Sequence, residues 1–121
     1  MVVKSFVEEY GLNELGVLYA RARRWDKAET SLREAIRLRP SFPAAQTNLG
    51  RVYASQGSTS KAEAMFAQAL QVDPRHTEAL IHRAKLRHDL GQKEAAVADL
   101  NVLETIDPAL ASRVRTKLGL D

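Results

Sequence analysis

Three histidines are the residues of this chain best suited to bind a metal ion or to transfer a proton near neutral pH. They are His76, His82 and His88, each six positions from the next. Zinc-binding helices carry histidines four positions apart beside a glutamate, as in His-Glu-x-x-His, because residues four apart share a helix face. A spacing of six directs the imidazoles to different faces, and the chain has no cysteine. The sequence therefore predicts no metal site.

Motifs for phosphate binding and nucleophilic catalysis are also missing. The stretch Gly57-Ser58-Thr59-Ser60 lacks the lysine and the preceding strand of a phosphate-binding loop. The sequence contains no Gly-x-Ser-x-Gly elbow, and nothing in it indicates a pocket that would raise the pKa of a carboxyl group. We therefore expect no enzyme activity and no cofactor.

Composition and charge indicate one globular domain. The chain has 121 residues, of which 45% are hydrophobic and 27% charged, and its formal net charge is +3. No run of about 18 apolar residues is present that could cross a membrane. The first residues lack the apolar segment of a signal peptide. We expect a cytoplasmic protein, with a periplasmic protein or an excised domain as alternatives.

A period of 34 residues organises the sequence. It is clearest in Pro40, Pro74 and Pro108, which are 34 positions apart. Four columns of similar residues in one register indicate three copies of one structural unit. The other three columns are Gly16, Gly50 and Ala84; Ala28, Ala62 and Ala96; and Leu32, Phe66 and Leu100.

Each unit is predicted to contain two amphipathic helices joined by a turn. In the second unit, apolar residues three and four apart predict one helix before Gly57 and another between Gly57 and Pro74. Glycine suits the left-handed conformation in which many helices end. Candidate caps are Ser60 with Glu63, Asp26 with Glu29, Asp73, and Thr77.

These columns resemble the motif of the tetratricopeptide repeat family, although the third unit departs from it at Arg83, Arg87 and Leu103. The resemblance implies an all-α fold, a right-handed superhelix (solenoid) of three helix-turn-helix units in one domain, 1–121. The units would span about 9–42, 43–76 and 77–110, followed by a capping helix at about 108–119. The matching residues are Leu12, Leu15, Gly16, Tyr19, Ala28, Leu32, Ala35, Pro40, Leu49, Gly50, Tyr53, Ala62, Phe66, Ala69, Pro74, Leu80, Ala84, Ala96, Leu100 and Pro108.

The two ends of the chain are expected to differ from the repeats. Leu110, Val114 and Leu118 form one apolar stripe that would face inward and close the last unit, as a solenoid requires. Residues 4–22 are expected to form one long first helix, on which Phe6 and Val7 extend the apolar surface.

In the resembling family, the first helix of each pair lines a concave groove that takes a peptide of a partner protein. The resemblance thus implies a non-catalytic scaffold or adaptor. Cations outnumber anions on this side, which favours a mildly acidic peptide or a chain-terminal carboxylate, the alternative being a merely solvated face. Asn48 is the strongest single candidate, since its amide donates and accepts at once. The expected groove residues are Asn13, Val17, Arg21, Asn48, Arg51, Ser55, His82, Lys85 and Asp89, with Tyr10, Glu14, Thr47, Glu78, Ile81, His88 and Arg115 as further candidates.

One subclass of that family binds the C-terminal carboxylate of heat-shock chaperones. It uses lysine and asparagine in the first unit, asparagine in the second, and lysine and arginine in the third. The corresponding residues here are Asn13, Val17, Asn48, Glu78 and His82. Only Asn48 matches, and Glu78 would repel a carboxylate. We predict that the chain does not bind chaperone tails in this way.

Arg83 and Arg87 share a helix face where the family packs an apolar residue and a tyrosine. Asp99 and Glu94 are candidate partners for them. The pair indicates either a loosened, solvated third unit or a binding site for an acidic partner. Trp25 is expected to pack between the two helices of the first unit.

Two other functions stay open. Basic runs at 21–24 and 113–117 could bind nucleic acid weakly and without sequence specificity, although they lie near opposite ends of the chain and lack aromatic residues for base stacking. Phe6 and Val7 could allow end-to-end self-assembly.

Overall fold

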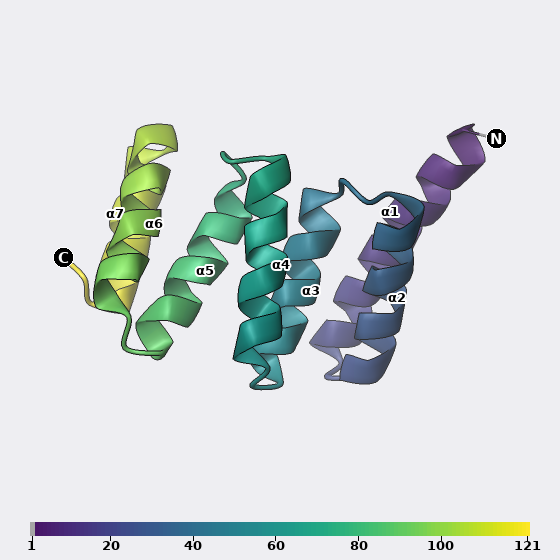
Figure 1. Ribbon diagram of the computed structural model, residues 1–121, viewed down its shortest axis with the longest axis horizontal. Coiled ribbons are helices and arrows are strands. Elements are labelled where there is room, and N and C mark those ends of the chain that lie inside the picture. Colours follow the sequence, from purple (N-terminus) through teal and green to yellow (C-terminus); the bar gives the residue numbers. More distant parts are fainter. Residues whose placement is uncertain (1) are drawn as a thin grey trace.

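The computed structural model describes the backbone of residues 2–121 and the side chains of residues 8–121. Within these limits the chain is all α-helical. Figure 1 shows the helices side by side in a row, with the two termini at opposite ends. The helices are α1 (Val2–Arg21), α2 (Trp25–Leu38), α3 (Pro43–Ser55), α4 (Thr59–Val72), α5 (Thr77–Asp89), α6 (Lys93–Ile106) and α7 (Pro108–Leu118).

The helices pack in consecutive pairs. The most extensive contacts join α1 to α2, α3 to α4 and α5 to α6, and α7 lies against α6. The prediction of three helix pairs followed by a capping helix is therefore confirmed.

No helix in the described part of the chain is long and apolar enough to span a membrane. The side chains of Phe6 and Val7, on which the prediction of self-assembly rested, lie outside the described residues.

The glycine column marks the points where paired helices come closest. A Cβ atom added to Gly16 would lie 2.6 Å from Cγ of Leu32, and one added to Gly50 would lie 2.6 Å from Cε1 of Phe66. The large apolar side chain of the second helix thus fills the space above each glycine of the first. This contact explains why small and large residues recur together every 34 positions.

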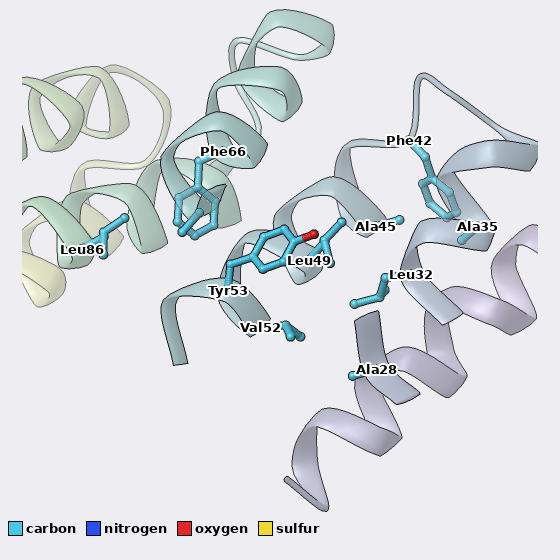
Figure 2. Close-up of a cluster of buried hydrophobic side chains, with 11 residues drawn as sticks. Ala28, Leu32, Ala35, Phe42, Ala45, Leu49, Val52, Tyr53, Phe66 and Leu86 are labelled. Atoms are coloured by element: carbon cyan, nitrogen blue, oxygen red, sulfur yellow. The ribbon is translucent and has the colours of Figure 1, made fainter. Parts of the chain in front are cut away.

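The buried residues form several clusters along the row instead of one central core. Figure 2 shows the largest cluster, which extends from Leu32 on α2 through Leu49 on α3 to Phe66 on α4 and Leu86 on α5. A separate cluster at the C-terminal end joins α5, α6 and α7. Its buried members are Ala84, Leu100, Leu103 and Ala111.

The turn inside each pair repeats as regularly as the helices do. Gly57 and Gly91 both have a φ of +77°, and Arg23 at the same place in the first pair has a φ of +60°. A left-handed conformation is open to glycine and costly for a residue with a Cβ atom. Gly57 therefore ends α3 as predicted, whereas the first turn adopts the same conformation with an arginine.

The predicted helix caps are wrong. Ser60 lies inside α4, and the residue that precedes this helix, Ser58, makes no side-chain capping bond. Asp26 likewise lies inside α2. Asp73 instead accepts a hydrogen bond from the backbone N–H of Arg75. Asp107 does cap a helix, because its side chain accepts from the backbone N–H of Leu110 at the start of α7.

A polar joint connects each helix pair to the next. The Tyr53 hydroxyl on α3 donates to Oε2 of Glu29 on α2 over 3.0 Å. One period later, Arg87 Nε on α5 donates to Oε1 of Glu63 on α4 over 3.2 Å. The two glutamates that the sequence suggested as capping residues are therefore contacts between repeats.

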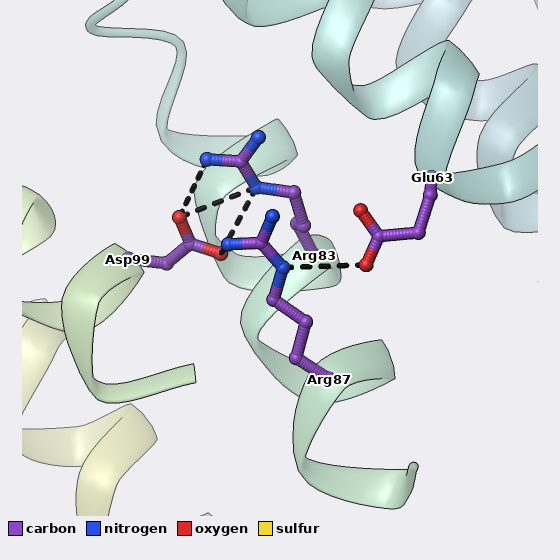
Figure 3. A network of polar contacts seen from close by, with 4 residues as sticks. All are labelled: Glu63, Arg83, Arg87 and Asp99. Carbon is purple, nitrogen blue, oxygen red and sulfur yellow. Dashed lines mark hydrogen bonds and ion pairs between the residues drawn. The ribbon is translucent and has the colours of Figure 1, made fainter. Parts of the chain in front are cut away.

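Arg83 and Arg87 belong to a closed ionic network (Figure 3). Arg83 binds both carboxylate oxygens of Asp99 on α6, its Nη2 lying 2.6 Å from Oδ1, and Arg87 Nη1 donates to Oδ2 over 3.1 Å. The side chain of Asp99 is 3% exposed. Asp99 is thus the predicted partner, whereas Glu94 is exposed at the surface. The two cations pair within the chain, with Asp99 on α6 and Glu63 on α4, which argues against both sequence interpretations.

Candidate functional site

Three cavities lie between alternate helices of the row. The first lies between α1 and α3 and is lined by Val17, Arg21, Asn48, Arg51 and Ser55 among others. The second, between α3 and α5, shares Arg51 and Ser55 with the first. The third, between α5 and α7, shares His82 and Lys85 with the second. Because neighbouring cavities share residues, they form one continuous surface, which we call the groove.

An amide pair fixes the polar end of the groove. Asn48 Nδ2 on α3 donates to Oδ1 of Asn13 on α1 over 3.0 Å. Asn13 is 6% exposed, so it orients its partner and presents little surface itself. Asn48 keeps its carbonyl oxygen and a second amide hydrogen for other partners.

Cations predominate along the groove. Arg21 lines the first cavity, Arg51 the first and second, and Lys85 the second and third. Asp89 is the one carboxylate among the lining residues of these cavities. Among the described side chains, none of the three cations has an ion-pair partner. The groove therefore presents positive charge that no described side chain neutralises by an ion pair.

His82 lies between these cations and is uncharged near neutral pH. Burial, together with the positive charges of Arg51 and Lys85, lowers the pKa of His82 to about 4. Glu78 lies one turn earlier on α5, its Oε2 3.6 Å from Nε2 of His82. His82 therefore adds no positive charge to the groove at physiological pH.

The structure brings together most of the predicted groove residues. All nine except Asn13 line a cavity, and Asn13 contacts the groove through Asn48. Several of the further candidates lie elsewhere. The Tyr10 ring packs edge-on against Phe42, with centroids 5.1 Å apart, Thr47 is buried, and Arg115 pairs with Glu104.

Sequence reasoning missed two parts of the lining. Trp25 packs against the core as predicted, but it also borders the first cavity. Leu110, Val114 and Leu118 are only half-buried and line the third cavity, beside Arg113 and Lys117. The apolar stripe of α7 had indicated a buried face, and its spacing alone could not show how much of it α5 leaves uncovered.

The described side chains contain no group of three or more histidine, cysteine, aspartate or glutamate residues that could hold a metal ion. The polar groups of the groove are amides and cations, together with a neutral imidazole, the hydroxyl of Ser55 and the carboxylate of Asp89. They can donate and accept hydrogen bonds and attract carboxylates. This set of side chains suits recognition of a ligand.

Comparison with known proteins identifies the repeat. Models of the tetratricopeptide repeat match residues 13–70 and 54–118. Over 92 residues the chain is 30% identical to the mitochondrial import receptor subunit TOM70 of Saccharomyces cerevisiae. That alignment covers 76% of this chain and 15% of the receptor. The chain thus spans about 15% of the length of the curated relatives that it matches.

Solved structures share the fold at low identity. Pseudomonas aeruginosa PilF superimposes with a TM-score of 0.86 at 24% identity, over 97% of this chain and 53% of that one. The TPR domain of Arabidopsis OM64 gives 0.84 at 21%, over 94% and 96%. The first TPR domain of Spaghetti (RPAP3), solved with an HSP90 peptide, gives 0.84 at 22%, over 93% of each chain. The fold is a right-handed superhelix of helix pairs, and the chain belongs to the tetratricopeptide repeat family.

Proposed function

We propose that this chain is a non-catalytic protein-interaction module that binds a peptide segment of a partner protein in the groove. One observation carries the proposal: three cavities join into a continuous surface along α1, α3, α5 and α7, which is lined by the amide of Asn48 and by three cations. Among the described side chains, these three cations have no ion-pair partner. A long, narrow surface of this kind suits an extended chain better than a compact small molecule.

The amide of Asn48 would hold the backbone of the peptide. Its free carbonyl oxygen and amide hydrogen match the alternating N–H and C=O groups of an extended chain. Arg51 is one turn further along α3 and would bind a carboxylate of the ligand, since arginine forms strong charge-assisted hydrogen bonds to carboxylates. Arg21 and Lys85 would extend this preference to both sides.

Relatives support a peptide as the ligand. The Spaghetti domain was solved with the HSP90 peptide SRMEEVD, and a TPR2B domain of yeast Sti1 with an Hsp70 peptide. This chain lacks the lysine and arginine that hold a chaperone carboxylate, and it has Glu78 and a neutral His82 at two of those places. We propose a different acidic ligand, and expect no micromolar binding of SRMEEVD in a fluorescence anisotropy titration.

Affinity capture from the native source tests the proposal. The bait is the immobilised chain, compared with the variant Asn48→Ala/Arg51→Glu and with Arg75→Glu, which changes an exposed cation that lines none of the three groove cavities. We expect a set of proteins that survives nuclease treatment, is lost with the groove variant and is kept with Arg75→Glu.

Two results would contradict the proposed function. Loss of the captured proteins on nuclease treatment would favour nucleic acid as the ligand. Equal capture by the groove variant would place the binding surface elsewhere. Light scattering over a concentration series, run on the same preparations, shows whether the chain itself assembles, because end-to-end stacking would raise the apparent mass with concentration.

A further inference from the structure

We infer that the cavity between α5 and α7 binds a large apolar side chain of a peptide segment in which that side chain is flanked by carboxylates. The inference rests on the proposed function and adds to it a second, chemically distinct subsite and a ligand class. It is separate from the amide end of the groove, because the first cavity shares no lining residue with the third.

The bottom of this cavity is apolar because α7 covers the last helix pair incompletely. Ala111 on α7 is fully buried in the cluster with Leu103 and Leu100 of α6, so α7 lies close to α6. Its stripe of larger side chains is turned toward α5 and stays half-buried. The result is a cavity of about 510 Å³ with an apolar lining of Ile81, Leu110, Val114 and Leu118.

The rim of the cavity is cationic. Lys85 on α5 and Arg113 and Lys117 on α7 line it, and no carboxylate does. Within residues 8–121, these three cations have no ion-pair partner. The neighbouring cation on α7, Arg115, is paired with α6. Its Nη1 lies 2.9 Å from Oε2 of Glu104, and its Nη2 donates to Oδ1 of Asn101 over 2.7 Å. On α7, the cation beside α6 is therefore paired, whereas Arg113 and Lys117, which line the cavity, have no ion-pair partner among the described side chains.

These features together select the ligand. Transfer of an apolar side chain from water into the cavity is favourable. Carboxylates beside that side chain would pair with the cations of the rim, and this electrostatic complementarity steers association and adds specificity. A phenylalanine or leucine between aspartates and glutamates meets both conditions. A flat anionic bilayer offers the same chemistry, but it cannot reach the bottom of a concave surface between two helices.

The test is binding of the peptide Gly-Glu-Glu-Asp-Phe-Leu-Asp-Glu-Gly-amide, which carries fluorescein on its N-terminal amine, to the intact chain, measured by fluorescence anisotropy. Two control peptides separate the contributions: one has serines in place of phenylalanine and leucine, and the other has amides in place of the carboxylates. We expect each control to bind at least about tenfold more weakly. We also expect backbone amide NMR shifts to concentrate on α5 and α7.

Variants of exposed residues then locate the site. Arg113→Glu/Lys117→Glu should weaken binding at least about tenfold, while Arg75→Glu/Lys93→Glu, a matched charge reversal at exposed positions that line none of the cavities, should leave it unchanged. Circular dichroism melting confirms that both double variants fold.

Several results would overturn the inference. Equal binding of the serine peptide would mean that the apolar lining is not used. NMR shifts on α1 and α3, with binding lost in Asn48→Ala/Arg51→Glu but not in Arg113→Glu/Lys117→Glu, would refute this subsite and leave the proposed function intact. Binding to anionic vesicles without binding to the peptide, or shifts on α5 and α7 caused by dilution of the chain alone, would assign the cavity to lipid or to a second copy.

Discussion

At the scale of single residues, the protonation of His82 decides how the groove responds to pH. The side chain of this histidine lies among positive charges on three helices, because Arg51 comes from α3, Lys85 from α5, and Arg113 and Lys117 from α7. Asp89 and Glu78 are the carboxylates on the same side of α5. Burial, and after it the positive charges of Arg51 and Lys85, disfavour protonation of His82, so the folded chain holds it neutral.

This leads to a pH-dependent loss of stability. The pKa of His82 is about 4 in the folded chain and 6.5 in the unfolded one, so between these values the unfolded state alone takes up the proton. Stability is full above pH 6.5 and falls with the pH toward 4. At pH 5 the loss is about 2 kcal/mol. Urea unfolding at pH 7.5 and pH 5 measures it, and His82→Asn should show a smaller drop by that amount.

An anionic ligand would act in the opposite direction on the same residue. A carboxylate bound near Arg51 and Lys85 would offset the part of the shift that their charges cause, so the pKa of His82 would rise, while the larger effect of burial would remain. An NMR titration of the imidazole with and without ligand reads this directly.

The close approach at Gly50 leads to a second prediction. In Gly50→Ala, the new Cβ atom would meet the Phe66 ring at 2.6 Å, and this ring is 1% exposed and cannot move aside freely. The overlap should lower the free energy of unfolding by about 1–2 kcal/mol, even though alanine favours the helix. Gly11→Ala is the control, since Gly11 is an exposed residue of α1 with no atom within 4 Å of its would-be Cβ.

The control should change stability in the other direction. An exposed glycine inside a helix costs about 0.5–1 kcal/mol relative to alanine, so Gly11→Ala should stabilise the chain. Chemical denaturation compares both variants. Equal effects at positions 11 and 50 would show that the glycine column does not set how closely the helices approach.

At the scale of helices, the ionic network that joins α5 to α6 leads to a prediction about stability. In Asp99→Ala, two partly buried arginines would lose their shared partner, and breaking such a network should cost about 3 kcal/mol. Glu94→Ala on the same helix removes an exposed carboxylate from the first turn, and should cost only about 0.5 kcal/mol. Thermal melts of both variants test the difference, and similar losses would contradict it.

The helices themselves could be predicted from the sequence, and their contacts only partly. The columns at 34-residue spacing predict three helix pairs, because residues that recur at a fixed period mark the positions that pack in every copy of the unit. Glu63 was assigned to a capping box because Ser60 stands three residues before it. The structure shows instead that Glu63 binds Arg87 across the joint. Such a contact depends on two long side chains from different repeats, so local spacing could not distinguish it from a cap.

The same limit applies to the groove. The positions along α1, α3 and α5 follow from the repeat, and eight of the nine predicted residues line a cavity there. The contribution of α7 did not follow, because α7 has no counterpart in the repeat. The burial of Asn13 was also missed, since it results from the specific hydrogen bond to Asn48.

The whole molecule is a row in which each helix pair contacts only its neighbours, and stability should vary along it. The pair of α3 and α4 packs against neighbours on both sides, whereas α7 contacts α6 and α5 on one side. In such a linear array the middle opens less often than the ends. Hydrogen exchange should be slowest in α3 and α4 and faster in α7. Uniform protection along the row would instead indicate a single cooperative unit.

The joints between pairs make the row extendable. The second unit carries both halves of the joint. Tyr53 binds a glutamate of the unit before it, and Glu63 binds a side chain of the unit after it. In a chain with residues 43–76 duplicated, the first copy of Glu63 would meet the second copy of Tyr53, which is the pairing that Glu29 and Tyr53 already make. The length of this molecule is therefore an adjustable property, and an engineer could lengthen the groove by copying one segment.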